Sequence, residues 1–82
     1  MLNLEVKTKL SVEETIGRLK SYFGKGGFGL EIKDENEACL NFEGSGGYVT
    51  ATVCEDGQHT KVELVGQEWE IQMKNFASKL PR

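Results

Sequence analysis

The sequence contains few of the residues that mark several classes of function. Its 82 residues include one histidine, one proline and two cysteines. Two cysteines are too few for a disulfide framework, and no run approaches the ~20 apolar residues that cross a bilayer. The first residues also lack a basic segment followed by an apolar core, so we expect no secretory leader. We therefore expect one domain over residues 1–82, located in the cytoplasm with reduced thiols.

The chain also lacks an excess of positive charge. Ten Lys and Arg residues stand against thirteen Asp and Glu, for a net charge of -3, and both signs are spread along the sequence. Nucleic-acid binding generally needs a basic stripe, because neutralising phosphates supplies most of the affinity. We therefore expect neither a nucleic-acid partner nor a membrane partner.

Glycine is plentiful, and one glycine cluster matches a known motif by its letters. Residues 24–29 are Gly-Lys-Gly-Gly-Phe-Gly, which fits G-x-G-x-x-G. The phosphate-binding form of this motif leaves a strand and opens a helix, so that backbone N–H groups face the phosphates. Here the predicted order is the reverse, because a helix precedes the loop and a strand follows it. The sequence therefore favours a loop that only connects the helix to the strand, with no bound phosphate.

Two segments have the apolar spacing of amphipathic helices. Over residues 67–80 one stripe is formed by Trp69, Met73, Phe76, Ala77 and Leu80. The second helix follows Ser11, which begins a capping box with Glu14, and its stripe is Val12, Ile16, Leu19 and Phe23. Gly24 is expected to stop this helix in a left-handed conformation, and Gly17 to allow close approach of another backbone.

The remaining segments alternate with a period of two and predict five strands. The predicted inward side chains are Leu2, Leu4, Val6, Thr8, Phe28, Leu30, Ile32, Ala38, Leu40, Phe42, Val49, Ala51, Val53, Thr60, Val62 and Leu64. Turns are expected at residues 34–36, 44–47 and 56–57. The turn at residues 44–47 joins two strands, and it would place Phe42 opposite Val49, Leu40 opposite Ala51 and Ala38 opposite Val53. An Asp56-Gly57 turn would oppose Val53 to Thr60, Ala51 to Val62 and Val49 to Leu64.

These elements predict an α+β, two-layer domain of order β-α-β-β-β-β-α. If the first strand pairs beside the last, the antiparallel five-stranded sheet has order 1-5-4-3-2, with two helices on one face. This element order resembles the TATA-binding-protein-like and helix-grip folds. The resemblance implies nucleic-acid binding on the open sheet face, or a ligand held between the sheet and the long helix. A TATA-binding surface needs apolar wedges and basic side chains, and the predicted outer face does not supply them.

The outward side chains of the predicted sheet mix charges with hydroxyl groups, as a solvent-facing antiparallel sheet does. Its centre contains Tyr48, Thr50 and Thr52 together with the thiols of Cys39 and Cys54. We take these five residues as candidates for binding a ligand or a protein partner. Trp69 is a sixth candidate, with an indole N–H that needs a hydrogen-bond partner.

One catalytic hypothesis arises from the predicted register, which places Cys54 opposite His59. A thiol beside a histidine could act as a nucleophile if a carboxylate oriented the imidazole. The alternative interpretation without catalysis is a solvated hairpin end with a buried or half-exposed thiol nearby. Cys39, Cys54 and His59 lack the C-x-x-C spacing of structural zinc, so we expect neither a metal nor a cofactor.

The sequence therefore favours a non-enzymatic protein-interaction or binding module. Its partner would be another protein or a second copy, through the open sheet face or an edge strand. One alternative is a carrier of a small hydrophobic ligand, with a pocket between the C-terminal helix and the sheet. The other is a Cys-dependent enzyme that uses Cys54 and His59.

Overall fold

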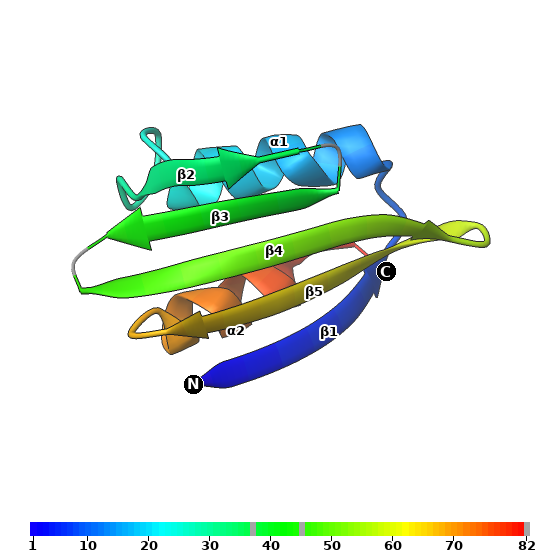
Figure 1. The fold of residues 1–82 in the computed structure, drawn as a ribbon. Coiled ribbons are helices and arrows are strands. Elements are labelled where there is room, and N and C mark those ends of the chain that lie inside the picture. Colours follow the sequence, from blue (N-terminus) through cyan, green and yellow to red (C-terminus); the bar gives the residue numbers. More distant parts are fainter. Residues whose placement is uncertain (37, 45, 82) are drawn as a thin grey trace.

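The computed structural model describes residues 1–36, 38–44 and 46–81. The elements in chain order are β1 (Leu2–Thr8), α1 (Val12–Phe23), β2 (Glu31–Glu35), β3 (Cys39–Gly44), β4 (Gly47–Asp56), β5 (His59–Gln67) and α2 (Glu70–Lys79). All neighbouring strands are antiparallel, and the sheet order β1-β5-β4-β3-β2 is the predicted one. Figure 1 shows both helices on the same side of the sheet, which confirms the two-layer α+β architecture.

The register confirms one predicted hairpin and corrects the other. Phe42 lies opposite Val49, as expected. Val53, however, lies opposite Val62 and not opposite Thr60. The loop residues of this hairpin are Gly57 and Gln58, and Gly57 alone has a positive φ, of 66°. A turn of this kind takes glycine at its first central position, whereas an Asp-Gly turn would require a positive φ at both central residues.

Helix α1 begins where the capping box predicts. The Glu14 N–H donates to Ser11 Oγ at 3.1 Å, and the Ser11 N–H donates to Glu14 Oε1 at 3.3 Å. The predicted left-handed stop at Gly24 is wrong, because its φ is -81° and its ψ is -155°. A side chain at Gly24 would instead collide with the Lys20 carbonyl, so close contact excludes larger residues there.

The prediction for Gly17 is also wrong. This glycine is exposed on α1, and a Cβ placed on it would have no atom within 4 Å apart from its chain neighbours and the backbone of its own helix. Within the described chain, therefore, no backbone of another element approaches it.

Helix α2 begins three positions later than the sequence predicted, at Glu70. Glu68 has a φ of 73° and turns the chain from β5 toward the helix, and Trp69 is an N-cap with no side-chain hydrogen bond to the helix. The apolar stripe is confirmed, because Met73 and Phe76 are buried against the sheet. Ile71 lies on the opposite face and is 71% exposed.

The core fills the single layer between the sheet and the helices. Its buried apolar residues are Val6, Leu19, Phe23, Leu30, Leu40, Phe42, Val49, Ala51, Val53, Val62, Leu64, Met73, Phe76, Ala77 and Leu80. Three buried threonines donate their hydroxyl protons to backbone carbonyls: Thr8 to Pro81, Thr15 to Ser11 and Thr60 to Leu10. Hydrogen bonding removes most of the cost of burying these groups.

The second strand differs most from its prediction. It begins at Glu31, and Phe28 and Ile32 are 48% and 39% exposed although both were expected to face inward. Gly29, at a φ of 81°, interrupts the alternation between Phe28 and Leu30. Ile32 faces the helix side opposite Phe42, but β2 is an edge strand, so no further strand covers its flank.

Both remaining turns connect the expected strands. Residues 34 and 35 belong to β2, so the turn predicted at 34–36 begins later, where the Asn36 N–H donates to Cys39 O. Gly44 and Gly47 lie opposite each other at the next turn. Ser45, within that predicted turn, lies outside the described residues. The glycine-rich loop connects α1 to β2, in the order that the sequence favoured.

Candidate functional site: the outer face of the sheet

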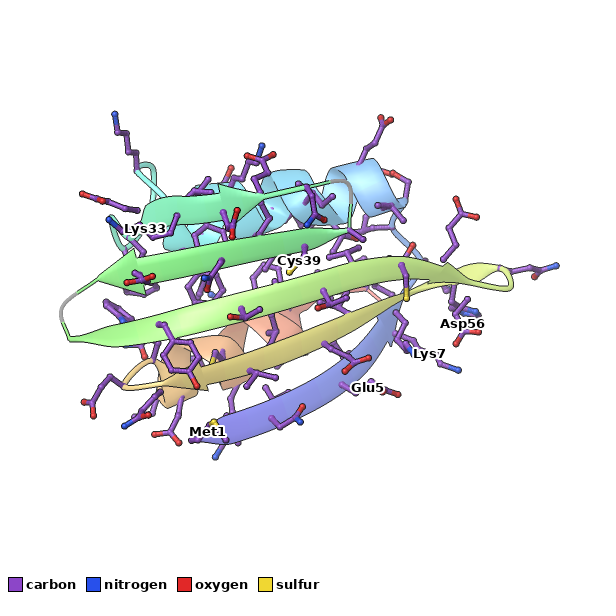
Figure 2. The ribbon with its side chains drawn as sticks, viewed as in Figure 1. Met1, Glu5, Lys7, Lys33, Cys39 and Asp56 are labelled. Carbon is purple, nitrogen blue, oxygen red and sulfur yellow. The ribbon has the colours of Figure 1, made fainter. Side chains whose placement is uncertain are left out.

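The face of the sheet opposite the helices carries an uncharged centre. We call it the central patch, made of Cys39, Asn41, Tyr48, Thr50, Thr52, Cys54 and Val65. The register places them in contiguous rows, because Thr50 lies between Asn41 and Val65, and Thr52 lies beside Cys39. Figure 2 looks onto this face, with Cys39 near its middle. Five of the six candidates from the sequence lie here.

Charged residues surround the central patch on the flanking strands. On one side Glu5 lies opposite Glu63 and Lys7 opposite Lys61. On the other side Glu31 lies opposite Glu43. Three cross-strand positions thus pair like charges, two between β1 and β5 and one between β2 and β3, and each such pair destabilises a sheet by a modest amount. The charges form a rim around a neutral centre.

Three ion pairs lie in this rim, of which Lys61 Nζ to Glu63 Oε1, at 3.7 Å, is the longest. Lys33 Nζ lies 2.9 Å from Glu31 Oε2, and this hydrogen bond and charge lower the pKa of Glu31 and raise the pKa of Lys33. Lys7 Nζ lies 3.0 Å from Asp56 Oδ2, where the hydrogen bond and then the charge of Lys7 lower the pKa of Asp56. Figure 2 shows Lys7 beside Asp56 at the hairpin end. Both carboxylates are exposed, so salt screens these pairs.

Hydrogen bonds fix part of the central patch. Thr50 Oγ1 lies 2.9 Å from Asn41 Oδ1 and donates to it across the strands. Tyr48 directs its hydroxyl toward Met1, with a distance of 3.2 Å from the oxygen to Sδ. Apart from exposed Thr52, the residues of the central patch are half-buried by their neighbours. The centre is therefore closely packed and presents hydroxyl, amide and thiol groups at fixed positions.

A groove of about 790 Å³ adjoins the central patch at the Gly44–Gly47 end of the face. It is lined by Asn41, Tyr48 and Thr50 from the patch, and by Glu31, Lys33 and Glu43 from the rim. The groove is open and its walls are mainly polar. It can accept a polar side chain or segment of a partner.

Val65 is the residue of the patch that sequence reasoning missed. It is apolar at an outward position of β5, where Lys61 and Glu63 are charged. The predicted alternation stopped at Leu64. Continuing the alternation of the strand by one residue would have placed Val65, an apolar side chain, on the solvent-facing side of the sheet.

Trp69 does not belong to this face. Its indole N–H donates to Gly44 O at 3.0 Å, and its ring centroid lies 5.7 Å from that of Phe28. The predicted need for a hydrogen-bond partner is thus met within the chain. Trp69 packs against the core from the N-terminal end of α2, apart from the other five candidates.

The register also corrects the geometry behind the catalytic hypothesis. Cys54 lies opposite Lys61, while His59 lies opposite Asp56 at the exposed end of the hairpin. Cys39 and Cys54 are free thiols, and Cys39 is opposite Thr52, one row away from Cys54. Such diagonal positions stand ~7–8 Å apart between Cα atoms, beyond the usual reach of a disulfide. Among the described residues, no three His, Cys, Asp or Glu side chains gather as metal ligands would.

The helix side has its own surface groove, between the two helices. Its volume is about 570 Å³, and Gly17, Arg18, Tyr22, Phe76 and Lys79 contribute to its walls. This position differs from the pocket expected of a carrier, which would lie between α2 and the sheet. Against the sheet, Met73 and Phe76 occupy the space beneath α2.

No protein-family model matches this chain, and neither does any curated protein. In the described part of the chain, neither helix has the length and apolar character needed to span a bilayer.

Proposed function

We propose that this chain is a non-enzymatic protein-interaction module that binds a protein partner through the outer face of its sheet. The observation that carries this proposal is the neutral central patch, surrounded by charges, on a face that neither helix covers. Protein interfaces share this anatomy, because their centres are depleted of charge while their rims are polar.

The composition of the central patch supports the proposal further. Tyr48 combines a large apolar ring with a hydroxyl, and tyrosine is enriched among the residues that dominate binding energy. Thr50, Thr52 and Val65 are β-branched and lose little side-chain freedom when a partner covers them. The alternation of acidic and basic rows in the rim would fix the orientation of the partner.

The test is affinity capture with the immobilised full chain, followed by identification and titration of the captured protein. We expect Tyr48→Ala and Thr52→Arg each to weaken binding by at least about tenfold, as truncating or blocking the centre of an interface does. Thr52 is exposed and lies opposite Glu63, so an arginine there can be accommodated in the folded chain.

Ser78→Arg is the matched control, because it changes an exposed hydroxyl residue on α2 to the same arginine. Its binding should equal that of the wild type. A captured partner that binds Tyr48→Ala and Thr52→Arg as tightly as the wild type would contradict the proposed surface. Circular dichroism of each variant would verify that the fold is kept.

A further inference from the structure

The two edges of the sheet differ in their protection against further strand pairing. Strand β2 is short and entirely exposed, and its register is irregular between Ile32 and Asp34. Short length, bulges and charges are the devices that natural proteins use to block edge pairing. Strand β1 has seven residues in unbroken register with β5. Its outer edge therefore has neither a bulge nor a short strand to prevent pairing.

Two backbone hydrogen bonds, one between β4 and the residue before β3 and one just beyond β1, identify the backbone groups at this edge. The Val53 N–H donates to Ala38 O at 2.7 Å, so odd-numbered residues of β4 direct their backbone groups toward β3. The alternation of antiparallel ladders then directs even-numbered residues of β1 toward β5. The Lys9 N–H agrees, because it donates to Pro81 O at 3.0 Å and not to β5.

Asn3, Glu5 and Lys7 consequently direct their N–H and C=O groups away from the sheet, at the open edge of β1. These are the groups that a further strand would bond. Pro81 closes this edge at Lys9, which leaves the ladder open up to Thr8.

Two residues of β1 face like charges across the strands within the chain, although Lys7 also lies 3.0 Å from Asp56 Oδ2. Glu5 lies opposite Glu63, and Lys7 opposite Lys61. A second antiparallel β1 with Val6 on the two-fold axis would place Glu5 opposite the second copy's Lys7, and Lys7 opposite the second copy's Glu5. Both pairs join opposite charges, and opposite charges facing each other across strands are stabilising. An axis at Glu5 or at Lys7 would instead bring identical charges together.

The helix side of the same strand is apolar and incompletely covered. Leu2, Leu4 and Leu10 are only half-buried beside the core. In the Val6-centred arrangement, Val6 meets its own copy and Leu4 meets Thr8 of the second copy. Because Val6 and Thr8 are already buried, the apolar side chain that this pairing would cover further is Leu4.

We propose that the chain forms a two-fold symmetric homodimer in which residues 4–8 of β1 pair antiparallel with the same residues of a second copy. The two sheets then continue as one across the axis. This surface is separate from the central patch. An experiment can therefore refute the dimer without refuting the proposed partner interface, and the reverse.

Charge reversal provides the first test. Glu5→Lys and Lys7→Glu each create two like-charged pairs across the axis, and we expect each variant alone to dimerise at least about tenfold more weakly. Mixed in equal amounts, the two variants restore both opposite-charge pairs and should form a heterodimer. Within one chain each reversal replaces a like pair by an opposite pair, with Glu63 or with Lys61, but Lys7→Glu also places a carboxylate beside Asp56 in place of their ion pair. Weaker dimerisation of Glu5→Lys therefore cannot be attributed to the cross-strand charge in the chain.

The backbone provides the second test. Glu5→Pro removes an N–H that faces the open edge and makes no bond to β5, so the fold should persist while dimerisation is lost. Glu5→Gln is the control, since it removes the same charge but keeps this N–H. Analytical ultracentrifugation measures the association, and circular dichroism verifies folding.

The expected results are a wild-type dimer, monomeric single reversals, a heterodimer in their mixture, and a folded, monomeric Glu5→Pro. A wild type that sediments as a monomer at about 0.5 mM would overturn the dimer. So would dimers of the charge reversals or of Glu5→Pro as tight as that of the wild type, or a mixture of reversals that stays monomeric. Thr52→Arg, on the central patch, should leave dimerisation unchanged.

Discussion

Gly66 offers a quantitative test of how α2 sits on the sheet. This buried glycine lies on the helix-facing side of β5, between Leu2 of β1 and Val49 of β4. A Cβ at this position would stand 2.5 Å from Tyr48 O and 2.7 Å from Met73 Sδ. The absence of a side chain at Gly66 is therefore what allows α2 to approach the sheet here.

The cost of Gly66→Ala follows from which of these atoms can move. Met73 Sδ belongs to a flexible side chain and can rotate, but Tyr48 O is backbone of the neighbouring strand. Relieving the contact requires β4 and β5 to shift, and overpacking of this kind costs about 1 to 3 kcal/mol. For a domain of this size each kcal/mol lowers the melting temperature by roughly 4 to 8 °C. We expect the melting temperature to fall by roughly 5 to 20 °C.

Gly17→Ala is the matched control, because the chemical change is identical and the surroundings are opposite. Gly17 lies on the exposed face of α1, and apart from its neighbours and the backbone of the helix itself no atom lies within 4 Å of the added Cβ. Alanine is favoured over glycine there by about 0.8 to 1 kcal/mol, so this variant should be more stable than the wild type.

Thermal unfolding followed by circular dichroism measures the melting temperatures. Urea unfolding measures the free energies of both variants, with the slope of the transition verifying that the two-state description applies. A Gly66→Ala protein with a midpoint at or above that of the wild type would refute the described approach of α2 to β5. A Gly17→Ala protein less stable than the wild type would refute the open surroundings of α1.

Three further predictions concern single contacts. Ser11→Ala removes the cap of α1 and should cost about 1 kcal/mol in urea unfolding, whereas no change would mean that the capping box is not formed in solution. Trp69→Phe removes the hydrogen bond to Gly44 O and should cost about 0.5 to 1.5 kcal/mol, with retained stability as the contrary result. Lys7 lowers the pKa of Asp56 from its ordinary value of 3.8, so this pair stabilises the fold above that value and the stabilisation is lost as the pH falls through the lowered pKa. Asp56→Asn should therefore be less stable than the wild type at neutral pH and equally stable in acid. Unfolding measured over a series of acidic pH values at low salt tests this. A difference in stability that persists in acid would contradict the ion pair.

Several features of the fold could be predicted from local sequence. Period-two alternation assigned Ala51, Val53 and Val62 to the buried face, and the structure confirms this. The capping box located the start of α1, because its two hydrogen bonds join residues only three positions apart. Five residues of the central patch were likewise identified, because alternation along one strand decides which face a side chain occupies.

Other features depended on contacts between distant segments. The register of β4 against β5 shifted by two residues from the prediction, a change that leaves every side chain on its face and is therefore invisible to alternation. The same shift separates Cys54 from the row of His59. The exposure of Ile32 reflects its position on an edge strand, and the open surface around Gly17 reflects which elements pack beside α1.

By itself, the sequence determined on which face of a strand or helix a side chain lies, because the period of these elements is a property of neighbouring residues. Only the tertiary structure decided which residues stand opposite one another, including the like charges at the edge of β1 and the neutral rows of the central patch. Cross-strand neighbours depend on the backbone of a turn and on the close approach that glycines such as Gly66 permit. The turn conformation is local but is not decided by alternation, whereas the close approach at Gly66 joins segments that are remote in the chain.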